Sequence, residues 1–307
     1  MSPDQYTNQE LFLDVGDGYQ LYVQDWGNKQ AATPIIFVHG GPGSSAQDKH
    51  KQIYDPTRQR VIFFDQRGCG KSLPYGSLEH NTTGDLVEDI EKIATRLELD
   101  KFVLTGGSWG CCLALAFALK YPQRVAALVL RGVFTGSQQE INWVDKGKFV
   151  NHFPDVWEEY LDATPKSHHH DPSSYHFERI LGDNPEAARE SAYAYENLEG
   201  SLIQLDDRFI PEDLTTYDPS GMRLEAHYLA NNCFLPDNHI LDNAHKLPMP
   251  VWLVQGRYDM VCPPITAYKL SQAIPDSHLV WTISGHKDER ESWSVVRAVL
   301  QQLSEGD

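Results

Sequence analysis

The sequence has little positive charge and no long hydrophobic run. Its 26 Lys and Arg stand against 43 Asp and Glu, which gives a formal net charge of −17. Nucleic acids and anionic membranes attract basic surfaces, so this balance argues against both as partners. No run approaches the roughly 18 consecutive apolar residues of a membrane-spanning helix, so we predict that the chain does not cross a membrane.

Cysteine is scarce as well, with five residues in 307. The odd count and the irregular spacing fit a reducing compartment better than a disulfide scaffold. No C-x-x-C pair is present, so we expect no structural zinc site. The first ten residues, MSPDQYTNQE, have neither a basic region nor an apolar region typical of a signal peptide. These features predict a soluble, cytoplasmic protein.

The acidity is unevenly distributed along the chain. Residues 151–250 contain 19 Asp and Glu but only 6 Lys and Arg. One interpretation is a solvated acidic surface, and the other is an electrostatic field that attracts cationic substrates. Composition alone leaves both open.

Short apolar runs predict the strands of one sheet. Residues 11–15 and 19–25 flank the turn Gly16-Asp17-Gly18 and predict a hairpin. The next four runs are unbroken, which is typical of parallel strands buried on both faces, and the last two resume the strand pattern. They cover residues 34–38, 61–64, 102–104, 127–130, 251–254 and 279–283.

Helical periodicity fills most of the gaps between these runs. Leu86, Ile90, Ile93 and Leu97 recur at spacings of three and four, an Ala- and Leu-rich segment covers 109–121, and a last amphipathic helix follows the final run. This alternation predicts an α/β fold with a mostly parallel sheet flanked by helices.

The alternation is interrupted once. Residues 135–246 contain no convincing buried strand, and we interpret them as a mostly helical cap inserted into the core. The predicted core then comprises residues 1–134 and 247–307.

The sequence Gly106-Gly107-Ser108-Trp109-Gly110 lies between the third unbroken run and a helix. It is a G-x-S-x-G motif in the strand–turn–helix context that the nucleophile elbow requires. A plain glycine turn is the alternative. We predict an α/β-hydrolase fold with Ser108 as the nucleophile.

A serine nucleophile needs a base and an acid that orients the base. In this fold the acid follows the serine in the chain and the histidine comes last. Asp259 follows the run 251–254 and His286 follows the run 279–283, so both lie where parallel strands place functional residues. Asp288 is the weaker candidate for the acid.

Acyl transfer also needs hydrogen-bond donors for the oxyanion, each of which contributes about 3 kcal/mol. One predicted donor is the N–H of Trp109, the residue after the nucleophile. The other is the N–H of Gly41, in the loop His39-Gly40-Gly41-Pro42-Gly43, where glycines allow a close approach of the backbone. We interpret His39 as structural rather than as a second base.

Several motifs in order resemble those of the proline iminopeptidases, serine peptidases of the α/β-hydrolase fold. The resemblance implies the same triad of Ser108, Asp259 and His286, and the same oxyanion donors. The motifs are HGGPG (39–43), DQRGCGKS (65–72), GGSWG (106–110), LRGVF (130–134), GRYDMVCP (256–263) and GH (285–286).

The resemblance also implies a substrate site in the cap. Glu196 and Glu225 would hold the free amino group of the substrate, since carboxylates bind a buried cation through charge-assisted hydrogen bonds. Phe134 and Trp143 would surround the proline ring.

The sequence departs from the family pattern at Val144 and Leu229, which stand where we expect Tyr and Phe. Cys262 corresponds to a family cysteine near the site, and we interpret it as a packing residue.

The sequence therefore predicts a serine aminopeptidase that releases an N-terminal residue, preferably proline, from small peptides through an acyl-enzyme. No metal or organic cofactor is expected. Two alternatives stay open: an esterase, lactonase or amidase acting on neutral small molecules, and a non-catalytic binding protein on the same fold.

Overall fold

The protein is built around one eight-stranded sheet. The computed structural model describes residues 6–203, 205, 213–287 and 290–305. The strand order is β1-β2-β4-β3-β5-β6-β7-β8; β1–β2 and β2–β4 pair antiparallel and the other neighbours pair parallel. The strands are β1 (Tyr6–Gly16), β2 (Tyr19–Asn28), β3 (Ile35–Val38), β4 (Arg60–Phe64), β5 (Phe102–Ser108), β6 (Val125–Val133), β7 (Val251–Gly256) and β8 (Ser277–Thr282).

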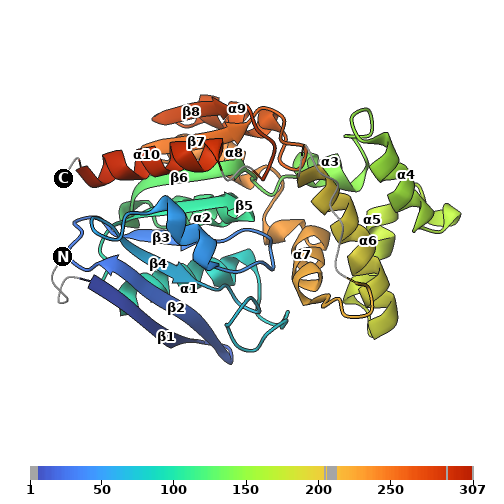
Figure 1. Ribbon diagram of the computed structural model, residues 1–307, viewed down its shortest axis with the longest axis horizontal. Helices are drawn as coiled ribbons and strands as arrows, with labels where there is room; N and C mark the ends of the chain where they lie inside the picture. Colours follow the sequence, from blue (N-terminus) through green and yellow to red (C-terminus); the bar gives the residue numbers. More distant parts are fainter. Residues whose placement is uncertain (1–5, 204, 206–212, 288–289, 306–307) are drawn as a thin grey trace.

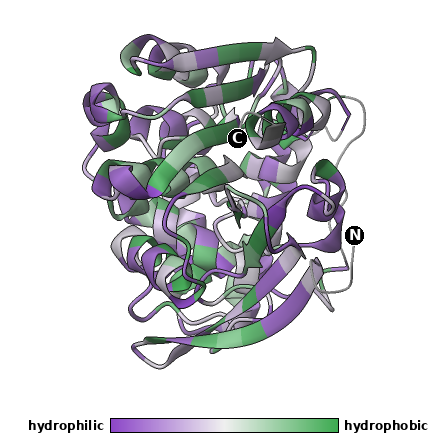
Figure 2. Ribbon diagram, turned by 90° about the vertical axis from the view of Figure 1, so that its left-hand side faces the viewer, coloured by the Kyte–Doolittle hydropathy of each residue, from purple (hydrophilic) through white to green (hydrophobic). Residues whose placement is uncertain are grey.

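The predicted hairpin and all six later runs are strands in the structure. All four residues of β3 are buried, as are the last four of β4. β1 instead alternates between exposed and more buried positions over Leu11–Val15, as expected for an antiparallel strand with one solvated face. Figure 2 shows this contrast between the hydrophobic central strands and the mixed hairpin. The predicted fold class is confirmed.

Helices cover both faces of the sheet. One face packs against α1 (Thr83–Arg96), α2 (Trp109–Lys120), α8 (His239–Asn243) and α9 (Pro264–Ala273). The other face packs against α10 (Glu291–Glu305) and the short 3-10 helix η1 (Asp48–Ile53). None of the described helices is long and apolar enough to cross a membrane.

A further group of helices lies together beyond one end of the sheet (Figure 1). They share a hydrophobic cluster of their own, which includes Phe149, Tyr160, Phe177 and Leu198. We call these helices the cap. They are α3 (Gln138–Asp145), α4 (Pro154–Asp162), α5 (Pro172–Leu181), α6 (Pro185–Ile203) and α7 (Ser220–Ala230).

The segment interpreted as the cap insertion, 135–246, also contains α8. Ile240 of this helix belongs to the hydrophobic cluster of the core, not to that of the cap. The division of the chain at residues 134 and 247 stays an interpretation.

Candidate active site

Ser108 lies at a sharp turn between β5 and α2. Its backbone has φ 57° and ψ −129°, a conformation that costs a non-glycine residue about 1–3 kcal/mol. The flanking glycines allow this turn to approach the end of β3. A Cβ at position 106 or 110 would lie 2.8 or 2.3 Å from the carbonyl oxygen of Val38. This packing explains why the motif needs glycine, and it holds Ser108 at the carboxyl end of the sheet.

The structure brings Asp259 and His286 together. The Nδ1 atom of His286 lies 2.8 Å from Oδ2 of Asp259, and both side chains are buried. The other carboxylate oxygen, Oδ1, accepts backbone N–H groups from Val261 and Cys262 at 3.0 and 2.8 Å. The carboxylate is therefore fixed in position and directs the Nε2 edge of the imidazole away from itself.

Two supporting residues were missed from the sequence. The amide of Gln255, at the end of β7, donates to Asp259 Oδ2 at 3.2 Å and accepts from the N–H of Val133 at 2.8 Å. Gly132 has φ +55°, and a Cβ there would lie 3.1 Å from Cε1 of His286. Position 132 is glycine because the imidazole packs against its backbone. No periodic pattern in the sequence predicts the contacts of Gln255 or Gly132, because these contacts join strands that are distant in the sequence.

The loop after β3 supplies the other side of the site. Gly41 has φ +106° and lines a cavity together with Ser108. His39 lies with its Nδ1 2.9 Å from the carbonyl oxygen of Gly40, and its Nε2 accepts the N–H of Gln66 at 3.0 Å. Since both ring nitrogens are occupied in holding the loop, the geometry supports a structural role for His39.

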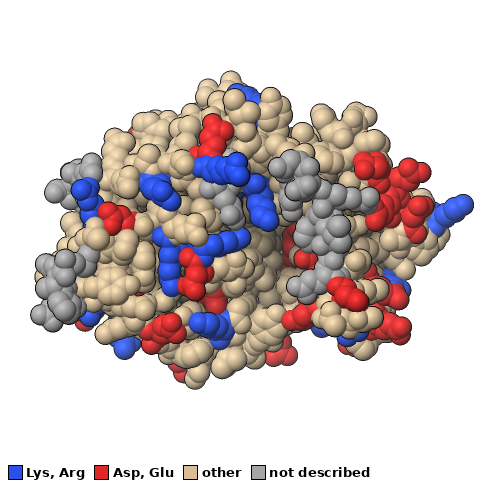
Figure 3. Space-filling model, in the orientation of Figure 1, with Lys and Arg blue, Asp and Glu red and all other residues tan. Residues whose placement is uncertain are grey.

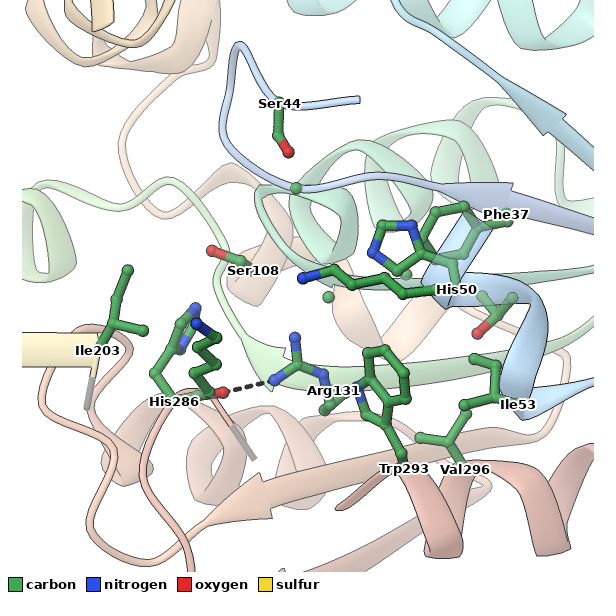
Figure 4. Close-up of a pocket in the computed structure, with 16 residues that line it drawn as sticks. Phe37, Ser44, His50, Ile53, Ser108, Arg131, Ile203, His286, Trp293 and Val296 are labelled. Atoms are coloured by element: carbon green, nitrogen blue, oxygen red, sulfur yellow. Dashed lines mark hydrogen bonds between the residues drawn. The ribbon is translucent and has the colours of Figure 1, made fainter. Parts of the chain in front are cut away.

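Ser108 lines three cavities at the interface of core and cap. The largest, of about 430 Å³, extends beneath the cap and is lined by Glu196, Glu199 and Glu225. A second, of about 270 Å³, extends over the core. The third, of about 30 Å³, has a mainly apolar lining that also includes Glu140, Glu199 and Glu225. We call them the acidic, basic and apolar cavities, respectively. The hydroxyl of Ser108 forms no hydrogen bond with any described residue, and it points into this space (Figure 4).

The acidic cavity contains one carboxylate that sequence reasoning missed. The carboxyl groups of Glu199 and Glu225 are neighbours in this cavity, and each perturbs the pKa of the other. Burial, together with the neighbouring carboxylate of Glu199, raises the pKa of Glu225 well above its usual range, so the pair retains a proton. Glu196 lines the same cavity next to Tyr217, whose pKa is raised by burial and by Glu196. Glu199 stands one helical turn after Glu196, and that spacing was the available signal.

The two predicted aromatics of the substrate site are in different places. Phe134 lines the apolar cavity with Val144, Leu229 and Cys262. Trp143 is not among its described lining residues. Its indole N–H donates to the carbonyl of Met260 at 2.7 Å, so it holds the loop that carries Asp259.

One group of described residues has the spacing of a metal site. Ligand atoms of Asp259, Cys262 and His286 lie within 4.8 Å of one another. However, both Asp259 oxygens already accept hydrogen bonds. Burial also raises the pKa of the Cys262 thiol well above its usual range, which opposes the thiolate that a metal would require. This donor set therefore suits a hydrogen-bonded acid–base pair better than a cation.

Comparison with known proteins places the chain in a family. Residues 33–287 match the family of the alpha/beta hydrolase fold. Over 291 residues, the chain is 37% identical to the proline iminopeptidase of Xanthomonas citri, with 92% of each chain covered. It is 39% identical over 282 residues to that of Arabidopsis thaliana, covering 87% of this chain and 72% of that protein. The chain belongs to the proline iminopeptidase family.

Solved structures agree on the fold. The crystal structure of the proline iminopeptidase of Mycobacterium smegmatis has a TM-score of 0.64 and 19% identity, and covers 97% of this chain and 98% of its own. The α/β hydrolase MGS-M2 from a deep-sea metagenome has a TM-score of 0.65 at 15% identity, with the same coverage. At such identities the likeness concerns the fold alone.

Membership of the proline iminopeptidase family confirms the resemblance drawn from the motifs. The alternative acid, Asp288, lies outside the described residues. The side chains of Asp259, His286 and Ser108 all lie where the core and the cap meet.

In Figure 3, Asp and Glu gather over the cap, whereas Lys and Arg gather over the core beside the central hollow.

Proposed function

We propose that this protein is a serine aminopeptidase that releases an N-terminal residue, preferably proline, from small peptides. The observation that carries the proposal is the acidic cavity, where Glu196, Glu199 and Glu225 share one space with Ser108 and His286. A neutral ester would gain nothing from three carboxylates beside the nucleophile. A substrate with a cationic amino group would gain charge-assisted hydrogen bonds to these carboxylates.

In the proposed mechanism, Nε2 of His286 removes the hydroxyl proton of Ser108 as its oxygen attacks the scissile carbonyl. Asp259 holds the Nδ1–H of the ring and stabilises the imidazolium. The N–H groups of Trp109 and Gly41 bind the oxyanion. His286 then gives its proton to the leaving amine, and water attacks the acyl-enzyme with His286 again as the base. Neither a metal nor an organic cofactor takes part.

Binding of the substrate amine would replace the proton that Glu199 and Glu225 share. The ammonium group then has carboxylate oxygens to accept its N–H groups, and its charge offsets that of the pair. With the amine so held, the first residue lies over Ser108, and its side chain faces the apolar cavity lined by Phe134 and Leu229. The mainly apolar lining of that cavity favours an apolar side chain.

The proposed setting follows from the surface and the cysteines. All five cysteines are free and buried, which suits a reducing, cytoplasmic environment. The acidic composition disfavours nucleic acid and anionic membranes as partners, so peptides with a free amino terminus are the proposed partners.

The substrate's amino group provides the test. We expect hydrolysis of proline arylamide and little hydrolysis of N-acetyl-proline arylamide, since acetylation removes the charge that the cavity binds. Glu199→Gln should lower kcat/KM for the free-amine substrate. Glu186→Gln, an exposed position on the same helix, serves as the matched control and should not lower it.

Two outcomes would overturn the proposal. Hydrolysis of short acyl esters without hydrolysis of arylamides, unaffected by Glu199→Gln, would favour the esterase alternative. A folded protein that hydrolyses neither class would favour a binding protein.

A further inference from the structure

The basic cavity adjoins the acidic one at Ser108 and His286, and no step of the proposed mechanism uses its cationic side chains. Lys49, Arg131 and Lys287 line it, and none of its sixteen described lining residues is Asp or Glu. The two cavities share Ser44, Ser108, Ile203, His286 and Lys287. Of these two cavities, the three glutamates line only the acidic one, Lys49 and Arg131 line only the basic one, and Lys287 lies where the two meet.

Arg131 is the best-fixed cation of this cavity. It extends from β6 towards Ser108 and His286, and its Nη1 donates to the carbonyl of His286 at 2.5 Å (Figure 4). A Cβ at Gly107 would lie 3.0 Å from Nη2 of Arg131, so the guanidinium packs against the residue before the nucleophile.

This guanidinium has no carboxylate partner among the described residues. Its hydrogen bond to the His286 carbonyl uses one of five N–H donors. A half-buried guanidinium without a counter-charge is desolvated without compensation, and planar carboxylates are the anions that it binds best. The charge in the cavity therefore favours an anionic group from outside the chain.

The positive charges of these side chains affect the pKa of a neighbouring histidine. His50, from the same 3-10 helix as Lys49, also lines the cavity. Burial first, and then the positive charges of Lys49 and Arg131, lower the pKa of His50 to about 4. His50 is therefore neutral at physiological pH and adds no positive charge for binding an anion.

The direction of the substrate identifies the anion. With the substrate amine in the acidic cavity and the scissile carbonyl at Ser108, the leaving amine points away from the glutamates, towards the basic cavity. In a dipeptide, the carboxylate is attached to the carbon next to that leaving nitrogen. Each further residue moves it away by up to about 3.3–3.6 Å, so only short peptides bring it to Arg131.

We propose that the basic cavity is a subsite for the terminal carboxylate of a short peptide, bound by Arg131 with Lys49 and Lys287. This inference rests on the proposed function and makes di- and tripeptides with both ends free the preferred substrates. The acidic cavity binds the amino terminus of the peptide and the basic cavity binds its carboxyl terminus. Only a short peptide can occupy both, so the two cavities together select for peptide length.

The test compares two substrates that differ only in this charge, prolylglycine and prolylglycine amide. The wild-type protein should prefer the acid by at least about ten-fold in kcat/KM, the ratio expected from one charge-assisted hydrogen bond. Lys49→Met and Arg131→Gln should each bring the ratio towards one. Glutamine at 131 keeps a donor for the His286 carbonyl. A purely structural role of Arg131 would lower both rates and leave their ratio unchanged.

Lys51→Met is the matched control. Lys51 lies on the same 3-10 helix, pairs with Asp48 at 2.6 Å and does not line the basic cavity, so the ratio should stay at its wild-type value. Equal hydrolysis of acid and amide by the wild-type protein would overturn the subsite while leaving the aminopeptidase intact. Hydrolysis of neither substrate would count against the proposed function itself.

Discussion

Glu225→Gln tests the acidic cavity because its effects on activity and on stability should have opposite signs. The substitution keeps the shape of the side chain and removes its charge. If this carboxylate receives the substrate ammonium, one charge-assisted hydrogen bond is weakened, at a cost of about 1.5–3 kcal/mol. That corresponds to a loss of about 10- to 150-fold in kcat/KM for proline arylamide.

The free energy of unfolding should change in the other direction. Because the pKa of Glu225 is raised, the unfolded chain loses its proton at a lower pH than the folded protein does. The contribution of Glu225 to the free energy of unfolding therefore falls as the pH rises above 4.5, the ordinary pKa of a glutamate side chain. Glutamine removes that loss and can still donate to Glu199.

The size of the effect can be stated as a change in Tm. Single stabilising substitutions commonly add about 0.5–2 kcal/mol. An unfolding entropy of about 2.1 cal/mol/K per residue over 307 residues converts this to an increase of about 1–3 °C. The increase should be present near pH 8 and shrink towards about pH 4.5.

The assay combines arylamide kinetics with thermal melts at several pH values, using Glu186→Gln as the control. A variant that melts below the wild-type protein near pH 8, yet keeps its kcat/KM, would refute the reasoning. That result would mean that Glu225 is a structural carboxylate and does not receive the substrate.

Two further substitutions test the base and its surroundings. Asp259→Asn should lower kcat by up to about 10⁴-fold, because asparagine favours the wrong tautomer of His286; arylamide turnover with an unchanged kcat would contradict this role. Gly132→Ala forces a Cβ to 3.1 Å from the imidazole at φ +55°, at a cost of about 1–2 kcal/mol in backbone strain alone. It should lower kcat more than it raises KM, and wild-type kinetics in a folded variant would show that the ring tolerates displacement.

The parts of the fold that could be predicted are those whose signal is local. The continuous apolar runs identified the central strands because both faces of those strands are buried. α9 was not predicted, since only Ala267 and Leu270 of its ten residues are buried and its apolar pattern is weak.

The same distinction holds for the site. Ser108, Asp259 and His286 follow strands, so strand positions and chain order are sufficient to nominate them. Glu199 and Arg131 carry no motif that sequence reasoning had linked to substrate. Their importance comes from what faces them, namely Glu225 across the cap and the carbonyl of His286 across the sheet, and such contacts arise only from tertiary packing.

The most direct measurement of the central claim is covalent labelling of Ser108. A fluorophosphonate probe should modify the folded protein once, as seen by intact-mass analysis, and the modified peptide should contain Ser108. Labelling should disappear in Ser108→Ala and slow down in the presence of prolylglycine. A folded wild-type protein that takes no label, or that is labelled equally in Ser108→Ala, would contradict the account.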